Sequence, residues 1–460
     1  MTDRDPPTVC IVTFGCQMNK LDSQLLRGEL VRHGFALSDE PDRADVVLYN
    51  TCSVRAHAED RAFSHLGAYR GRAEQEDGFI LGVIGCMAQR LGRGLVDRFG
   101  FVRLVCGTRA LLRVPEHLER IMAGGGAIVD VEEDGPFRFH RMPKMRAAPH
   151  RAYVSVMRGC DNFCSYCIVP YVRGREVSRP TGEIVEEVEA LAAEGVREVI
   201  LLGQNVNSYG KGLDGPVTLA DLLALVNDVK GLERIRFVTS HPKDMSGEVL
   251  DAVGGLDKVC ENLHVPAQSG SDAVLRRMNR GYTAAQYREM DERARQKIRG
   301  VELASDFMVG FPGETDADFE DTLRLLSEVG FQQSFIFKYS PRPGTRAARW
   351  PDDVPDQVKR ERNLALLAAQ ERFDAERRSA MLGREVEVLA DGPSKGDATK
   401  LSGRTRQNDI VVFEGGRDLV GRLCTTRIVD STPLTLFGEP ATGHSVDHDG
   451  TTSTTNNVRL

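Results

Sequence analysis

The sequence lacks a long apolar run, and its first residues lack the pattern of a targeting segment. A membrane-spanning helix needs about 20 consecutive apolar residues, and no stretch approaches that length. The opening MTDRDPPT has no apolar core of the kind found in secretory signal peptides. Ten cysteines in such a chain indicate a reducing compartment, where thiols serve metals or catalysis rather than disulfides. We therefore expect a cytoplasmic protein that does not bind a membrane.

Positive charge is not in excess either. The 60 Lys and Arg residues are outnumbered by 67 Asp and Glu residues, which gives a net charge of −7. This balance argues against bulk affinity for nucleic acid but leaves room for a local basic surface. With 460 residues, of which 41% are hydrophobic, the chain is long enough for about two to four domains with a large core.

Three closely spaced cysteines carry the clearest chemical signal. Cys160, Cys164 and Cys167 follow the spacing C-x3-C-x2-C inside MRGCDNFCSYCIVPYVRGREVSRP. A structural zinc site needs four protein ligands, and a fourth local ligand is missing. An iron–sulfur cluster held by three thiolates leaves one iron open for a non-protein ligand. The spacing therefore favours a cluster, with a zinc site or inert buried cysteines as the alternatives. Tyr166 would cover the cluster on one side.

Strands and helices alternate in the first part of the chain. Such alternation predicts a doubly wound parallel sheet with helices on both faces. The apolar, β-branched runs that predict strands lie at 8–14, 45–50, 79–84 and 101–105.

A cysteine follows each of the first three predicted strands. These residues are Cys16, Cys52 and Cys86. The carboxyl ends of parallel strands meet at one edge of a sheet, which is where ligand sites form in α/β folds. We therefore predict a second three-thiolate site and a second iron–sulfur cluster. The alternative is that each cysteine is only a small buried side chain, which is the role expected for Cys106 after the fourth strand.

Six further strand–helix units are predicted between residues 151 and 340. Parallel units of this kind curl toward a partial (β/α)6 barrel, whose functional face lies at the carboxyl ends of the strands. Polar and Gly-rich residues gather at those ends. The predicted strands are 153–157, 198–202, 234–238, 262–265, 303–309 and 334–338.

The last part of the chain changes character after a charged helix predicted at 354–381. Short alternating strands separated by Gly and Asp turns predict a small antiparallel β-barrel, a size that often binds oligonucleotides. Its local candidates for phosphate contact are Lys395, Lys400, Arg404 and Arg406. A second candidate is the linker before the cysteine triplet, where residues 138–158 hold six Lys or Arg and no acidic residue. A merely solvated linker is the alternative.

The triplet resembles the signature of radical S-adenosylmethionine (SAM) enzymes, and the whole arrangement resembles the radical SAM methylthiotransferases. This resemblance covers roughly residues 8–440. It implies the following organisation: a cluster-binding N-terminal domain at 8–125, a basic linker at 126–150, a radical SAM domain at 151–378, a TRAM β-barrel at 379–440 and a disordered tail at 441–460.

Four stretches favour one branch of that family. GQNVNSYG (203–210), TSHP (239–242), MNRGYT (278–283) and GRTRQN (403–408) are similar to the branch that modifies isopentenyladenosine at position 37 of tRNA. The alternative branches modify threonylcarbamoyladenosine in tRNA or an aspartate of a ribosomal protein. The resemblance implies tRNA as the partner, recognised at its anticodon loop, with an electron donor such as a flavodoxin or ferredoxin. It names no sulfur donor, and we expect a monomer.

The resemblance also implies two 4Fe–4S clusters with different roles. The cluster on Cys160, Cys164 and Cys167 would cleave SAM to a radical that abstracts hydrogen from carbon-2 of the adenine. The cluster on Cys16, Cys52 and Cys86 would carry the sulfur, which a second SAM methylates. Residues that would line the SAM pocket are Gln204, Asn205, Ser240, Gln268, Gly310, Phe311, Pro312 and Gly313.

Overall fold

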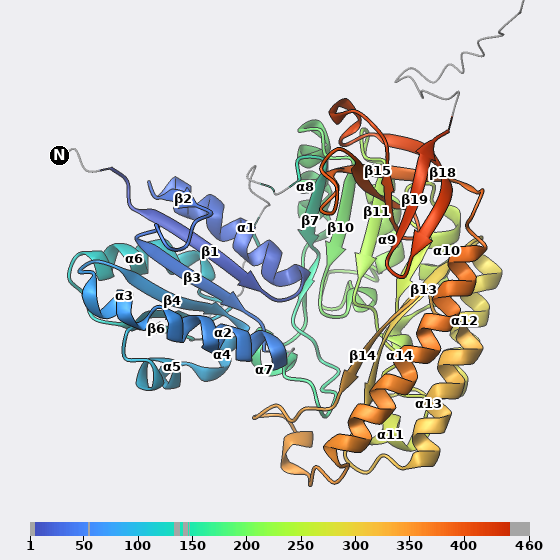
Figure 1. The fold of residues 1–460 in the computed structure, drawn as a ribbon, viewed down its shortest axis with the longest axis horizontal. Coiled ribbons are helices and arrows are strands. Elements are labelled where there is room, and N and C mark those ends of the chain that lie inside the picture. Colours follow the sequence, from blue (N-terminus) through green and yellow to red (C-terminus); the bar gives the residue numbers. More distant parts are fainter. Residues whose placement is uncertain (1–4, 54–55, 133–138, 141–145, 147, 442–460) are drawn as a thin grey trace, which may run out of the picture. The chain divides into compact units, whose positions relative to one another are not determined.

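The computed structural model describes residues 5–53, 56–132, 139–140, 146 and 148–441 (Figure 1). The chain divides into two compact units, Met1–Gln370 and Glu371–Leu460. The predicted tail from residue 442, together with residues 133–138, 141–145 and 147 of the predicted linker, lies outside the described residues. Among the described helices, none combines the length and apolar character needed to cross a membrane.

The first unit begins with a six-stranded sheet in which every pairing is parallel, as predicted. The strand order is β2-β1-β3-β4-β5-β6. Two strands that the sequence did not predict, β2 and β6, have only three residues each, too few for a periodic pattern, and β6 lies inside the segment predicted as a linker. The strands are β1 (Thr8–Phe14), β2 (Ala36–Ser38), β3 (Val46–Thr51), β4 (Ile80–Gly85), β5 (Val102–Cys106) and β6 (Ile128–Asp130).

Helices cover both faces of this sheet, so its strands are buried on both sides (Figure 1). On one face, α1 (Gln17–Arg32) and α6 (Val114–Met122) pack in one hydrophobic cluster with the strands. On the other face, α2 (Ala56–Ala68), α4 (Cys86–Leu91) and α5 (Arg93–Arg98) pack in a second cluster. Burial on both faces explains why β3 and β4 read as continuous apolar runs.

The middle of the first unit forms the predicted partial barrel of six parallel strands. Two three-stranded sheets, β7-β10-β11 and β12-β13-β14, are joined by a parallel bridge between Ile235 and Val259. The strands are β7 (Arg151–Ser155), β10 (Glu198–Leu202), β11 (Arg234–Val238), β12 (Asn262–His264), β13 (Glu302–Val309) and β14 (Gln333–Lys338).

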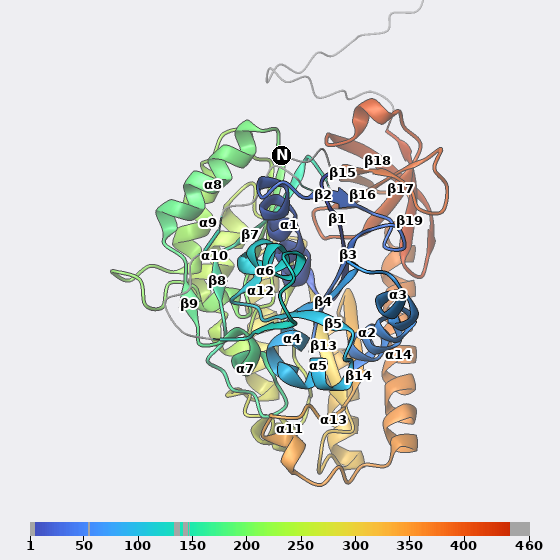
Figure 2. The same cartoon turned by 90° about the vertical axis from the view of Figure 1, so that its left-hand side faces the viewer.

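Helices that contact one another in chain order surround this barrel (Figures 1 and 2). Three of them begin with a capping box, in which a threonine and a residue three positions later satisfy each other's backbone N–H groups. Each capping box fixes the residue at which its helix begins. The helices are α8 (Thr181–Ala193), α9 (Leu219–Asn227), α10 (Gly247–Gly255), α12 (Ala284–Lys297) and α13 (Asp316–Val329).

One buried carboxylate ties three barrel strands together. Glu198 of β10 is fully buried and accepts hydrogen bonds from Arg151 of β7 at 2.6 Å and Arg236 of β11 at 2.8 Å. Burial alone would raise the pKa of Glu198, but Arg236 and Arg151 together lower it to about 2. The charge is therefore retained inside the sheet by its two partners.

The second unit is a closed five-stranded barrel entered through α14 (Asp356–Ser379), which crosses the division between the units. Its strand order is β15-β16-β17-β19-β18, around a core that includes Val388, Phe413 and Ile428. Four pairings are antiparallel as predicted, and the pairing of β17 with β19 is parallel. The strands are β15 (Glu385–Pro393), β16 (Leu401–Thr405), β17 (Ile410–Phe413), β18 (Leu423–Thr432) and β19 (Thr435–Pro440).

Replacing the buried carboxylate should destabilise the barrel strongly. Glu198→Gln leaves two buried guanidinium groups without their counter-ion, so we expect the free energy of unfolding at pH 7 to fall by about 3–5 kcal/mol in urea denaturation. The control Glu328→Gln removes an exposed ion pair with Arg288 and should cost less than about 1 kcal/mol.

The same variant should also change the pH dependence of stability. The folded pKa of Glu198 lies below the unfolded value of about 4.3, so its contribution is present above that value and is lost as pH falls toward about 2. The difference between wild type and Glu198→Gln should therefore shrink on acidification below about pH 4. Equal effects of Glu198→Gln and Glu328→Gln at pH 7 would contradict this interpretation.

Candidate functional site

The first three predicted site cysteines lie together at the carboxyl edge of the N-terminal sheet. Cys16 follows β1 and precedes α1, Cys52 follows β3, and Cys86 is the first residue of α4, directly after β4. The strand order reverses between β1 and β3, which places Cys16 and Cys52 on either side of the crevice where doubly wound sheets bind ligands. Cys52 and Cys86 are 1% and 2% exposed.

The thiols at this edge act directly on one another. A hydrogen bond from the Cys52 thiol, helped by the charge of Arg173, lowers the pKa of Cys16 to about 5 against the opposing effect of burial. Asn19 accepts a hydrogen bond from Cys16 at 3.3 Å and is held in turn by Asn50 at 2.8 Å. A low thiol pKa means that Cys16 is readily available as a thiolate, which is the form that binds metal.

A glycine precedes Cys86 for a steric reason. Gly85 has φ of +89°, and a Cβ at this position would overlap the side chain of Asn50. The close approach brings the end of β4 against β3, so the Gly-Cys pair positions the Cys86 thiol beside the other two.

The second triplet lies in a tight loop between β8 (Met157–Arg158) and α7 (Val169–Arg173). The Cys167 N–H donates to the carbonyl of Cys164 at 2.9 Å, and Cys160 and Cys164 are 9% and 8% exposed. Burial raises the pKa of Cys160 to about 11, and burial together with the charge of Cys164 raises that of Cys167 to about 12. Three crowded thiols of this kind ionise only against a cation, and a metal that coordinates them supplies one.

The loop that carries this triplet is held in a strained conformation. Phe163 has φ of +46°, and Asn279 donates to the carbonyl oxygens of Asn162 and Phe163 at 3.1 Å each. A Cβ on Gly159 would overlap the carbonyl of Arg175. Strain that the surroundings maintain in this way is typical of functional loops.

A buried arginine that the sequence did not single out touches the second triplet. Arg280 Nη1 lies 3.5 Å from Cys164 Sγ and 3.5 Å from the Tyr166 hydroxyl, while Nη2 donates to the carbonyl of Pro266 at 2.7 Å. Tyr166 packs edge-on against Phe311, with ring centroids 6.3 Å apart. The triplet therefore has a cationic neighbour, and Tyr166 of the same loop packs against an apolar cluster.

The residues predicted to line a SAM pocket lie where the barrel strands end. Gln204 and Asn205 follow β10, Ser240 follows β11, and Gln268 follows β12. Gln204 Oε1 accepts from the Gly159 N–H at 2.5 Å, which connects this rim to the cysteine loop.

Several polar atoms on this rim are buried without a protein partner. They are Gln204 Nε2, Asn205 Oδ1, Ser240 Oγ and Nε2 of His241, a residue that sequence analysis did not select. Burial lowers the pKa of His241, so the ring is neutral. Because buried polar groups normally have partners, unsatisfied ones gathered at a strand rim indicate a ligand site. The positive φ of Gln268, +68°, adds local strain at the same edge.

The loop Gly310–Gly313 contributes in a different way. Its backbone is fixed by Glu314, which accepts from the Gly310 N–H at 2.9 Å and from Arg362 at 2.7 Å. Phe311 is fully buried in the cluster that packs against Tyr166. Phe311 thus connects this loop to Tyr166, which lies between Cys164 and Cys167 in the sequence.

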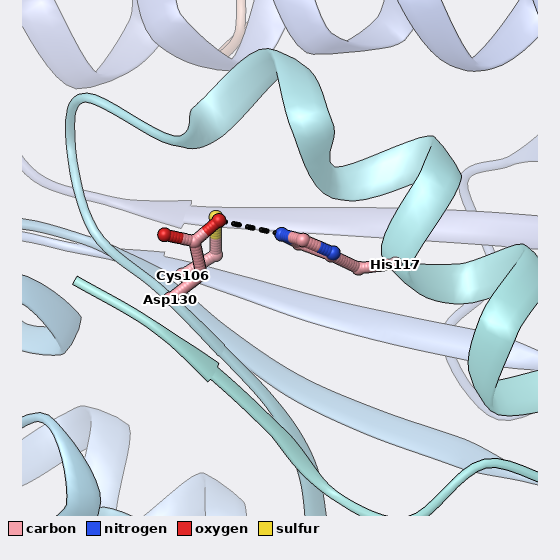
Figure 3. A group of neighbouring side chains, drawn as sticks. All are labelled: Cys106, His117 and Asp130. Atoms are coloured by element: carbon pink, nitrogen blue, oxygen red, sulfur yellow. Dashed lines mark hydrogen bonds and ion pairs between the residues drawn. The ribbon is translucent and has the colours of Figure 1, made fainter. Parts of the chain in front are cut away.

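Cys106 belongs to a separate buried group (Figure 3). Ligand atoms of Cys106, His117 and Asp130 lie within 4.8 Å of one another, the one such group among the described residues. His117 Nε2 bonds Asp130 at 2.6 Å, and Arg113 bonds both carboxylate oxygens at 2.9 and 2.7 Å. Asp130 is therefore already charge-balanced, and the network ties α6 to β5 and β6. Among the described residues, neither cysteine triplet brings its three sulfur atoms within 4.8 Å of one another.

The basic candidates on the C-terminal barrel fall into two groups. Lys395 and Lys400 lie before β16, and Arg406 lies after it. The five residues of β16 separate these groups by about 16 Å. Arg404 is partly buried and contacts the turn after β16, where its Nη1 donates to the carbonyl of Asn408 at 2.9 Å.

Comparison with protein families gives three matches that together cover most of the chain. Residues 8–107 match the family described as Uncharacterized protein family UPF0004, residues 154–326 match the Radical SAM superfamily, and residues 379–441 match the TRAM domain.

Curated relatives and solved structures agree with these matches. A protein of Clostridium beijerinckii named tRNA-2-methylthio-N(6)-dimethylallyladenosine synthase is 43% identical over 431 residues, covering 93% of this chain and 95% of the relative. One of the same name from Clostridium perfringens is 42% identical, covering 95% and 98%. The radical SAM methyltransferase TsrM from Kitasatospora setae shares the fold, with a TM-score of 0.54 at 15% identity over 75% of this chain and 77% of that one. The chain therefore belongs to the tRNA-2-methylthio-N(6)-dimethylallyladenosine synthase family of radical SAM enzymes.

Proposed function

We propose that this chain converts N6-dimethylallyladenosine (isopentenyladenosine) at position 37 of tRNA into its 2-methylthio derivative, with one SAM cleaved and one used as methyl donor. The main support for the proposal is that two three-cysteine sites lie close together within one unit. Cys86 of the first triplet packs against Ile168 and Val172, which directly follow the second triplet. Radical generation and sulfur delivery can thus occur side by side.

The donor sets fit two 4Fe–4S clusters. Each site offers three thiols, which leaves one iron of a cluster open, and neither triplet is compact enough for a single ion among the described residues. When bound, the cluster on Cys160, Cys164 and Cys167 supplies an electron to SAM, and the cluster on the other triplet supplies sulfur. Arg280 places a positive charge 3.5 Å from the Cys164 sulfur.

The barrel rim is suited to hold SAM by its polar groups. The unpartnered amide of Gln204, carbonyl oxygen of Asn205 and hydroxyl of Ser240 provide donors and acceptors for its amino, carboxylate and ribose groups. Tyr166 and the buried Phe311 close the opposite side with apolar surface. Together these residues orient the cofactor and exclude water, which protects a reactive radical from side reactions.

Access to carbon-2 of the adenine requires the base to leave its stack. Bases of a single-stranded loop can be splayed out and inserted into a pocket, which favours an anticodon-loop substrate. Lys395 and Lys400 on one side of β16, with Arg406 on the other, would contact the phosphate backbone and position the RNA. The reducing electron comes from a flavodoxin or ferredoxin in the cytoplasm.

Mass spectrometry of nucleosides tests the proposed reaction directly. Protein reconstituted with iron and sulfide under anaerobic conditions is incubated with SAM, dithionite and tRNA carrying isopentenyladenosine. We expect 2-methylthio-isopentenyladenosine together with 5′-deoxyadenosine. Methylthiolation of tRNA that carries threonylcarbamoyladenosine, with none on the isopentenylated tRNA, would overturn the substrate assignment in favour of the other tRNA branch.

Single alanine variants should separate the roles of the two triplets. Cys164→Ala should reduce 5′-deoxyadenosine formation to background, because the SAM-cleaving cluster loses a ligand. Cys52→Ala should retain 5′-deoxyadenosine formation but abolish the methylthio product. Cys10→Ala, a buried core cysteine in β1, serves as the control and should retain both. Methylthio product from Cys52→Ala would contradict the second-cluster assignment.

A further inference from the structure

Arg173 reaches from the SAM-cleaving half of the site into the sulfur-delivering half. It is the last residue of α7, the short helix that follows Cys167, and its side chain is 4% exposed. Its Nη2 donates to Asp22 Oδ2 of α1 at 2.7 Å, across a sequence separation of 151 residues. Removing two charges from water costs desolvation free energy. An ion pair this deeply buried must therefore be compensated by good hydrogen bonding or retained for a function.

The end of α7 is fastened so that Arg173 has a fixed direction. The Thr108 hydroxyl donates to the carbonyl of Val172 at 2.6 Å, and Arg158 Nε donates to the carbonyl of Arg173 at 3.1 Å. Arg158 Nη2 also donates to the Thr108 hydroxyl at 2.7 Å. The carbonyl groups that a helix end leaves free are thereby satisfied by side chains from both domains.

The guanidinium of Arg173 meets the cysteines of the first triplet. Its positive charge acts on Cys86 and Cys16, because α7 contacts α4, the helix that begins at Cys86. Cys86 packs in turn against Ile168 and Val172 of the same loop and helix. Asp22 accepts the hydrogen bond from Arg173 and offsets part of its positive charge.

We propose that Arg173 is a positioning residue of the second cluster, whose buried positive charge lies beside the cluster ligands and raises the reduction potential of that cluster. The inference rests on the proposed function, because it requires a cluster on Cys16, Cys52 and Cys86. Reduction adds negative charge to a buried site, and a fixed cation beside the ligand sulfurs stabilises the reduced form.

If the ion pair between Arg173 and Asp22 only holds the two domains together, the variants should behave differently. In that case Arg173→Gln and Asp22→Asn would both break one ion pair and would have similar consequences. If Arg173 acts electrostatically, the two variants must shift the potential in opposite directions. Arg173→Gln removes a positive charge beside the cluster, whereas Asp22→Asn removes the negative charge that offsets it.

The test uses the full chain with Cys160, Cys164 and Cys167 changed to alanine, so that it can hold only the second cluster. Iron and sulfide are quantified, and the reduction potential is measured by an EPR-monitored redox titration. Arg173→Gln should lower the equilibrium constant for reduction about tenfold, which for one electron is a shift of about 59 mV to more negative potential. Arg173→Lys should recover part of that shift, and Asp22→Asn should move the potential to more positive values.

The possible results test two claims separately, the role of Arg173 and the presence of the second cluster. A potential that Arg173→Gln leaves unchanged, or that moves in the same direction in Arg173→Gln and Asp22→Asn, overturns the inference. If Arg173→Gln does not retain a cluster, the signs of the shifts in Arg173→Lys and Asp22→Asn decide in the same way. A triple-alanine parent without iron and sulfide contradicts the second cluster, and with it the proposed function rather than the role of Arg173 alone.

Discussion

The docking of α7 against the carboxyl edge of the N-terminal sheet is the contact on which the rest of the site depends. The helix has only five residues and is therefore about 7.5 Å long. Its first turn follows Cys167, and its last residue reaches Asp22 beside the other triplet. Thr108 and Arg158 fix its end. A short, fastened helix thus keeps two reactive sites near each other, as a radical substrate and a sulfur source require.

The surrounding fold supplies what that contact needs. A parallel sheet brings Cys16, Cys52 and Cys86 to one edge although they are far apart in the sequence, and the barrel does the same for the polar rim that includes Gln204 and Ser240. The buried charge of Glu198 is compensated by its two arginines. Several buried polar atoms without a protein partner lie at the rim, where a ligand would provide one.

Much of this arrangement could be predicted from the sequence, because the signals are local. Apolar runs identify the strands, and the cysteines directly after them identify the sheet edge. The three-residue strands β2 and β6 carry no such pattern, so residues 128–130 were assigned to a linker. The sequence does not identify Arg173, Arg280 and His241, because each has a key partner that is distant in the sequence. These partners are Asp22, Cys164 and Asn207 respectively. The separation of Lys395 and Lys400 from Arg406 became visible only once β16 was placed between them.

The most direct test of the account is the magnetic interaction between the two clusters. EPR spectra are recorded for the fully reconstituted, dithionite-reduced protein and for two variants, each lacking the cysteines of one triplet. Two reduced clusters separated by a five-residue helix should couple, so the wild-type spectrum should be broadened or split relative to the sum of the two single-cluster spectra. A wild-type spectrum equal to that sum, with both clusters fully reduced, would contradict the claim that α7 holds the two cluster sites close together.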